Sequence, residues 1–171
     1  AAAHIPQVGY RLIDLQHGAD QLLEKLLTAA AHVAVWAMRM HGHDDRVIEG
    51  LHQMSEVLRR MMVEPNGPAA LTALLRYLLA SHERLDQIEL QHAIAQAIHP
   101  QAGEQVVTVY EQLVEEGRKK GGADILLNQL ATRFGPLPAD VTERVKHADL
   151  AELTAWSTRV LTAATLAETL E

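Results

Sequence analysis

Residues 110–141 read YEQLVEEGRKKGGADILLNQLATRFGPLPADV, and they divide the chain into two parts. Apolar residues recur at helical spacing on both sides of a basic, glycine-rich segment at residues 117–122. Each glycine inside a helix costs about 1 kcal/mol relative to alanine, so the glycines of this segment predict either a weakened helix or a hinge. We favour a hinge that can also be helical, lying between a helix that begins near Gly103 and another from Ala123 to Phe134.

The amino-acid composition indicates an all-α protein. Of the 171 residues, 48% are hydrophobic but only 4% are aromatic, and leucine and alanine dominate the apolar set. These residues favour the packing of helix on helix over a sheet core. A chain of this length can hold one ordinary domain, or a domain with a small appendage.

Cysteine content, hydropathy and charge restrict the compartment and the partners. The chain has no cysteine, which excludes disulfide bonds and thiolate metal sites. It also lacks an apolar run of the roughly 20 residues that a membrane-spanning helix needs, and it shows no signal-peptide pattern. We therefore expect a cytoplasmic protein that does not bind membranes. The formal net charge of −7 argues against a general nucleic-acid-binding surface, because phosphate groups are bound by clustered lysine and arginine.

The first part of the chain, residues 1–116, is expected to form a bundle of about four to five helices. Helical periodicity, with breaks at Gly42, Pro65 and Pro100, predicts the boundaries of these helices. Near the start, residues 8–15 contain β-prone residues in partial alternation and can form a single strand. A lone strand leaves its backbone groups unpaired, so it indicates that neighbouring structure is missing.

The last part of the chain, residues 123–171, is expected to form a small C-terminal helical domain of three or four short helices. The segment Gly-Pro-Leu-Pro at residues 135–138 ends one helix and begins the next. Capping boxes at residues 149–152 and 165–168 mark two further helix starts. Such a unit is too small to be very stable unless it docks or pairs with another surface.

Two sets of motifs occur along the chain in a characteristic order. The first set is YRLIDL at 10–15, LLRYLL at 74–79, YEQL at 110–113 and EEGR at 115–118. It resembles the C-terminal half of the recombination-promoting nuclease and putative transposase family. The second set is Leu126-Leu127, RFGPLP at 133–138 and VLTAATL at 160–166. It resembles the small C-terminal domain of unknown function that often follows such nucleases in bacteria, and together the two sets cover nearly all of the chain after residue 7.

The resemblance implies that intact family members carry a metal-dependent nuclease core, in which an Asp and a Glu-x-Lys triplet on adjoining strands hold a divalent ion. That chemistry needs oxygen ligands from two strands beside a lysine, and this sequence offers at most one strand. Glu116-Gly117-Arg118 imitates the triplet but lies in the predicted helix or hinge. We therefore expect the non-catalytic, helical C-terminal portion of such a protein, with no enzymatic activity, no catalytic residue and no cofactor.

A cluster of histidines and aspartates is the best local candidate for a metal site. It consists of His41, His43, Asp44 and Asp45. Imidazoles with nearby carboxylates can hold zinc or nickel, but two histidines one residue apart give too few ligands for a structural zinc site. We favour the alternative, a solvated turn between helices with capping aspartates, and predict no metal site.

The glycine-rich segment also suggests a contact between two helices. Gly117 and Gly121 lie about one helical turn apart and can let two helices approach closely. The residues of this candidate dimer seam are Val106, Tyr110, Leu113, Val114, Gly117 and Gly121. The alternative is a flexible join, and both stay open because glycine spacing of this kind is informative mainly in membranes.

These observations leave two hypotheses for the function. In the first, the chain is a non-catalytic oligomerisation and regulatory module, whose partner is a second copy or an attached DNA nuclease core. In the second, it is an accessory domain in DNA processing, in which Arg118, Lys119 and Lys120 contact phosphates. The acidic balance of the chain ranks the second hypothesis below the first.

Overall fold

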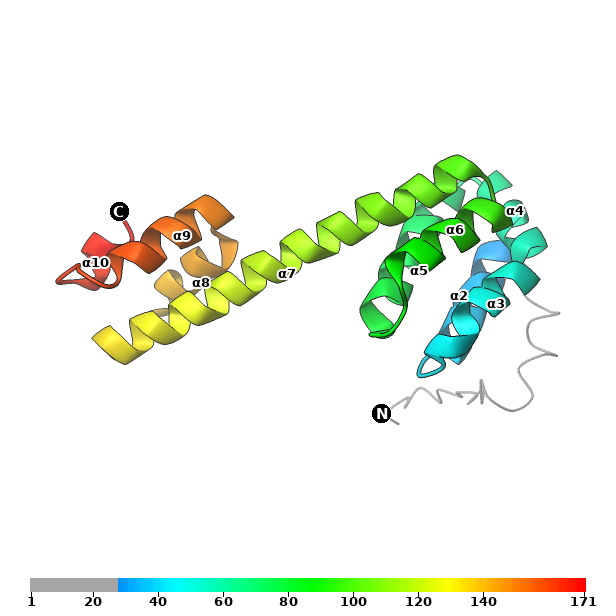
Figure 1. The fold of residues 1–171 in the computed structure, drawn as a ribbon. Helices are drawn as coiled ribbons and strands as arrows, with labels where there is room; N and C mark the ends of the chain where they lie inside the picture. Colours follow the sequence, from blue (N-terminus) through cyan, green and yellow to red (C-terminus); the bar gives the residue numbers. More distant parts are fainter. Residues whose placement is uncertain (1–27) are drawn as a thin grey trace, which may run out of the picture. The chain divides into compact units, whose positions relative to one another are not determined.

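The computed structural model describes residues 28–171, and within this range the chain consists of helices without a strand, as the composition predicted (Figure 1). The first elements are α2 (Ala29–Arg39), the 3₁₀ helix η1 (Asp44–Arg46), α3 (Val47–Gln53), α4 (Ser55–Val63), α5 (Gly67–Ser81) and α6 (Gln87–Ala97). They are followed by α7 (Pro100–Phe134), α8 (Ala139–His147), α9 (Leu150–Arg159) and α10 (Leu166–Thr169). The strand predicted at residues 8–15 lies outside the described residues.

Helix α7 is a single element of 35 residues. It is continuous through residues 117–122, so of the two forms expected for this segment the structure has the helical one. The prediction of separate helices on either side is wrong, because both are parts of α7. Glu115 lies four residues before Lys119, and such acid-before-base pairs stabilise a helix by about 0.2–0.5 kcal/mol each. Glu116 and Lys120 have the same spacing. The two pairs together offset part of the helix stability that the glycines cost.

The chain divides into two compact units, Ala1–Val109 and Tyr110–Glu171. The boundary falls inside α7, before residue 116, where the sequence predicted the end of the helical bundle. Val109 is the last buried residue of α7 before Ala123, so the helix leaves the first core earlier than its apolar periodicity suggests. The role of residues 117–122 as a hinge stays a prediction.

The first unit is built around the leucines of α5. Helix α2 packs on α4 and α5, and α3 packs on α6. The fully buried side chains include Leu51, Leu58, Leu71, Leu75, Leu78, Leu90 and Ile94. At Gly50 an added Cβ would lie 2.7 Å from the Trp36 ring, so the absence of a side chain lets α3 approach α2. Asp86 caps α6 by accepting from the N–H groups of Ile88 and Glu89.

The second unit packs α8, α9 and α10 against the C-terminal half of α7. Its core includes Leu126, Leu130, Val145, Leu153 and Trp156. Gly135 follows α7 with a φ of +86°, in the left-handed region that glycine adopts without strain, so α7 ends where the sequence predicted. Asp149 and Glu152 form both hydrogen bonds of the predicted capping box at the start of α9.

Two arginines fix the C-terminal segment within this unit. Arg133 of α7 donates to the carbonyl oxygens of Val160 and Ala163, which lie just after α9. Arg144 of α8 donates to the carbonyl oxygen of Leu170 at 2.7 Å. Carbonyl groups at the end of a helix lack an intrahelical donor, so the guanidinium of Arg133 supplies one. This contact gives the arginine of the RFGPLP motif a structural role.

Candidate interaction surface on helix α7

The middle of α7 lies outside both hydrophobic cores. Val109 is 2% exposed and Ala123 is 4% exposed, and no residue between them is buried. Only Leu113 and Gly122 in this stretch are half-buried, and the other residues are exposed. More than three turns of helix, at about 3.6 residues per turn, are therefore available for contact with another molecule.

Four exposed residues in this stretch lie on one side of the helix. They are Tyr110, Val114, Gly117 and Gly121, and we call them the α7 stripe. Their spacing of four, three and four residues keeps them on one face, because an α-helix turns by about 100° per residue. Tyr110 is 40% exposed and Val114 is 42% exposed, so both side chains are accessible to a partner.

The other residues of the predicted dimer seam have different environments. Val106 is fully buried in the first unit, so it is not available to a partner while that unit is folded. Leu113 is half-buried and lies beside the stripe. Helical periodicity predicted one continuous seam from residue 106, but it does not indicate where the core of a unit ends.

The two glycines of the stripe differ from the glycines in the cores. A Cβ at Gly50 would lie 2.7 Å from the Trp36 ring, and one at Gly103 would lie 2.9 Å from atoms of α6. Packing within the chain therefore accounts for those glycines. A Cβ at Gly117 or Gly121 would meet no neighbouring atom within 4 Å, and neither residue has a positive φ. Within the described part of the chain, nothing requires glycine at these two positions.

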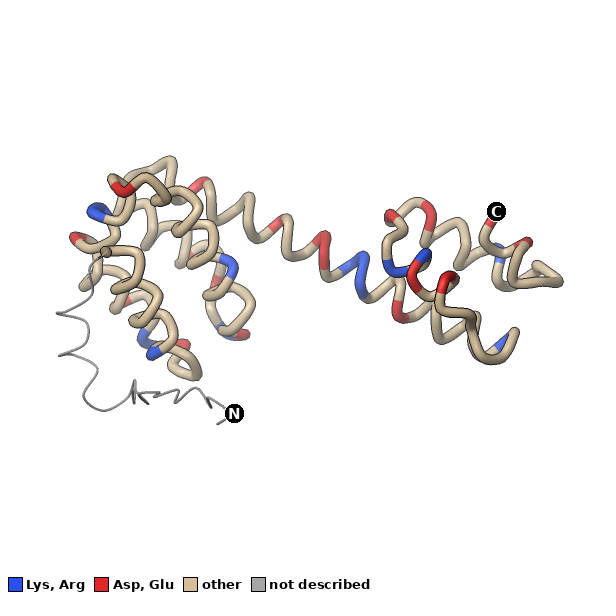
Figure 2. The backbone as a smooth tube through the Cα atoms, turned by 180° about the vertical axis from the view of Figure 1, so that it is seen from behind, with Lys and Arg blue, Asp and Glu red and all other residues tan. Residues whose placement is uncertain are grey.

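Charge changes sign along this part of α7. Acidic positions come first and basic positions follow, as Figure 2 shows along the helix. They are Glu111, Glu115 and Glu116, followed by Arg118, Lys119 and Lys120. Glu111 and Arg118 are seven residues apart, about two helical turns, so both lie on the same side of the stripe. One edge of the stripe is therefore acidic near one end and basic near the other.

The basic residues predicted to contact phosphates do not share one face. Arg118, Lys119 and Lys120 are consecutive and exposed, and consecutive helical residues point about 100° apart. Glu115 lies about one turn before Lys119, on the same side of the helix. Binding to DNA depends on several cations that neutralise phosphates together. This arrangement therefore gives a phosphate-binding function little support.

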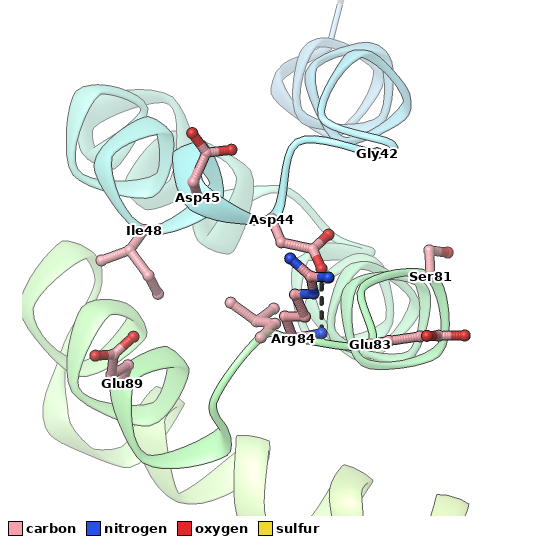
Figure 3. Close-up of a pocket in the computed structure, with 9 residues that line it drawn as sticks. Gly42, Asp44, Asp45, Ile48, Ser81, Glu83, Arg84 and Glu89 are labelled. Atoms are coloured by element: carbon pink, nitrogen blue, oxygen red, sulfur yellow. Dashed lines mark hydrogen bonds between the residues drawn. The ribbon is translucent and has the colours of Figure 1, made fainter.

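A second feature is an open pocket of about 720 Å³ in the first unit, between η1 and the segment after α5 (Figure 3). The acidic residues of its lining are Asp44, Asp45, Glu83 and Glu89. Asp44 points toward Arg84, whose backbone N–H donates to Asp44 Oδ2 at 3.1 Å (Figure 3). Asp44 Oδ1 lies 2.6 Å from Nδ1 of His82, which therefore carries the donated proton.

The hydrogen bonds to Asp44 change its acidity. The bond from His82 lowers the pKa of Asp44 below its usual value, and the bond from the Arg84 N–H adds to this effect. His82 is only 2% exposed, and its Nε2 is buried without a hydrogen-bond partner among the described residues. The pair therefore ties η1 to the end of α5, with the histidine inaccessible to a substrate in the pocket.

The histidine and aspartate turn predicted from the sequence is present, but its contacts differ from the prediction. Asp44 or Asp45 was expected to cap the following helix, and the Asp44 side chain instead binds the segment after α5. His41 and His43 are exposed. Within residues 28–171 no group of three or more His, Asp or Glu side chains is placed to hold a metal ion. Sequence reasoning missed His82, because no local pattern links it to Asp44.

Comparison with protein-family models, curated proteins and solved structures gives no match to this chain. Within the described residues, no helix has both the length and the apolar character needed to cross a membrane. The α7 stripe and the sequence motifs are therefore the features of this chain that bear on its function.

Proposed function

We propose that this chain is a non-catalytic self-association and regulatory module of a DNA nuclease or putative transposase in the recombination-promoting nuclease family. The α7 stripe carries the proposal, because it combines two exposed apolar side chains with two glycines that no packing among residues 28–171 explains. A second copy binds along this stripe. The motifs quoted above, including RFGPLP at residues 133–138, support the choice of family.

The energetics of the stripe favour contact with a partner. Each exposed glycine costs the helix about 1 kcal/mol relative to alanine. A contact can offset this cost, because completing the burial of Tyr110 and Val114 contributes roughly 1 kcal/mol for each side chain. The distance between packed helices depends on the side chains at the contact, and glycine permits a closer approach than alanine.

The proposal assigns no catalytic residue to this chain. Glu116-Gly117-Arg118 is the segment that imitates the Glu-x-Lys triplet, and it lies exposed in the middle of α7. A metal-dependent nuclease core needs carboxylates from adjoining strands to converge on the ion. In our account an attached core supplies the chemistry, and this module sets the oligomeric state.

Replacing Val114 with glutamate tests the proposal. A charge at the centre of the contact loses its hydration on binding, so Val114→Glu should raise the dimer dissociation constant by about tenfold or more. Sedimentation equilibrium measures this constant, and circular dichroism checks that the helices are intact. Val63→Glu is the matched control, since Val63 is 87% exposed and belongs to a different helix, α4. Equal constants for the unmodified and Val114→Glu chains would contradict the proposal.

Phosphate contact by the basic segment is the second candidate function. It is favoured by three consecutive exposed cations, Arg118, Lys119 and Lys120. A mobility-shift assay with duplex DNA at low salt tests it, using the unmodified chain and the triple alanine variant. Binding that is lost in the variant would support this candidate, whereas no binding at low salt would exclude it.

A further inference from the structure

We infer that the partner at the α7 stripe is a second copy whose α7 runs antiparallel, with Tyr110 of each copy opposite Gly121 of the other. The inference rests on the proposed self-association and adds the orientation and register of the two helices. In this register Val114 of each copy lies opposite Gly117 of the other. A two-fold axis relates the copies, so each pairing occurs twice.

The order of large and small residues along the stripe favours the antiparallel orientation. Tyr110 and Val114 lie in its N-terminal half, and the two glycines lie in its C-terminal half. Both halves have the same spacing of four residues, so a reversed copy places each large side chain over a glycine. A parallel copy would place tyrosine against tyrosine and glycine against glycine. It would therefore combine crowding at one end with unfilled space at the other.

The charges beside the stripe favour the same orientation. Glu111 and Arg118 lie on the same edge, seven residues apart. In an antiparallel pair the equivalent edges of the two helices face each other, so Glu111 of each copy lies beside Arg118 of the other. In a parallel pair, this edge of one helix faces the other edge of the second helix. Arg118 of one copy therefore lies beside Leu113 of the other. Only the antiparallel pair brings these opposite charges together.

The length of the stripe limits the strength of the contact. Val106 continues the spacing toward the N-terminus but is buried in the first unit. Between Tyr110 and Gly121 the helix advances by about 17 Å, at 1.5 Å per residue. A contact of this length is small compared with the interfaces of stable complexes. We therefore expect a weak dimer that dissociates on dilution through the micromolar range.

Reversing the charges tests the register. Glu111→Arg places arginine beside Arg118 of the second copy, and Arg118→Glu places glutamate beside Glu111. Each single change should raise the dimer dissociation constant by about tenfold at low salt, since two symmetric pairs are affected. The double variant should return it to within about twofold of the unmodified value. Both residues are exposed in the chain, so the changes leave the cores in place, and sedimentation equilibrium gives the constants.

Crosslinking measures the register independently. The chain has no cysteine, so Glu111→Cys and Arg118→Cys each introduce one thiol. With a short bis-maleimide, a mixture of the two variants should give crosslinked dimers that contain one copy of each. In this register the mixed pair is offset by only about 3 Å along the helix axis, whereas residue 111 of the two copies is separated by about 14 Å and residue 118 by about 8 Å. Glu111→Cys alone should therefore give few crosslinked dimers, and Arg118→Cys alone fewer than the mixture.

The outcomes separate the register from self-association itself. A stable dimer whose affinity is unchanged by the single charge reversals would overturn the antiparallel register and leave the proposed function intact. Efficient crosslinking of the Glu111→Cys variant alone would have the same meaning. A monomeric unmodified chain at every concentration would overturn both the proposed function and the register.

Discussion

Asp44 and His82 are 38 positions apart in the sequence, and a hydrogen bond of 2.6 Å joins them. Asp44 also accepts from the backbone N–H of Arg84, so both oxygens of one carboxylate are used. Both donors stabilise the ionised form of the carboxylate. At the residue scale, this pair is the contact that holds η1 against the end of α5.

Replacing Asp44 with asparagine should lower the melting temperature of the first unit at neutral pH, because an amide offers one acceptor oxygen in place of two. The pKa of Asp44 is lowered in the folded chain, so the unfolded chain binds this proton more tightly. The stabilisation is therefore fully present above the usual aspartate pKa and is lost as the pH falls through the lower, folded-state pKa. The difference between the two chains should shrink when thermal unfolding is repeated at about pH 3.

Asp45→Asn is the control for this experiment, since Asp45 is an exposed neighbour in the same pocket. It should have little effect at either pH. A melting-temperature difference for Asp44→Asn that is the same at neutral and acid pH would show that the charge of Asp44 is not involved.

At the scale of elements, α7 combines two environments in one helix. One face of each end contributes buried side chains to the core of a unit, and its middle is exposed. A helix with Gly117, Gly121 and Gly122 in its interior is weakened at that point. In our account, contact with a second copy stabilises this segment.

Replacing Gly117 and Gly121 with alanine should affect the chain and the dimer in opposite ways. The folded monomer should become more stable by roughly 1 kcal/mol for each change, because alanine has the highest helix propensity. The dimer should weaken, because the added methyl groups keep the two helices apart. Thermal unfolding measures the first effect, and sedimentation equilibrium measures the second.

Lys119→Ala provides the comparison, because it introduces alanine on the side of α7 opposite the stripe. Its dimer should match that of the unmodified chain at moderate salt. A tighter dimer in the glycine-to-alanine variant would contradict a close approach of the helices at these glycines and favour a flexible join.

The sequence predicted those features of the elements that depend on local signals. Gly135 ends α7, and Asp149 with Glu152 caps α9, because each signal acts within a few residues. The continuity of α7 was left open, since propensity alone does not decide between a weak helix and a hinge. The pairing of Asp44 with His82 had no local signal, because it depends on how η1 and α5 pack.

At the scale of the whole molecule, the two units have separate hydrophobic cores. Leu75 is fully buried in the first unit and Leu126 in the second. The sequence predicted two parts, but it placed the end of the first part at residue 116, later than the observed end at Val109. The reason is that the apolar spacing of α7 continues beyond the buried residues. For the α7 stripe, the helical spacing was predictable from the sequence, whereas the exposure of its side chains depends on where each core ends.

Separate cores predict separate unfolding transitions. Leu75→Ala should lower the stability of the first unit by about 2–5 kcal/mol, and Leu126→Ala should do the same in the second. Each change should shift one calorimetric transition and leave the other in place. A single transition that both changes shift equally would show that the two units unfold cooperatively.

Self-association is the central claim, and the molar mass of the unmodified chain in solution tests it most directly. Light scattering over a dilution series gives this mass. The account predicts a value that approaches twice 18.8 kDa at high concentration and falls toward 18.8 kDa on dilution. A constant 18.8 kDa at every concentration would contradict self-association through the α7 stripe.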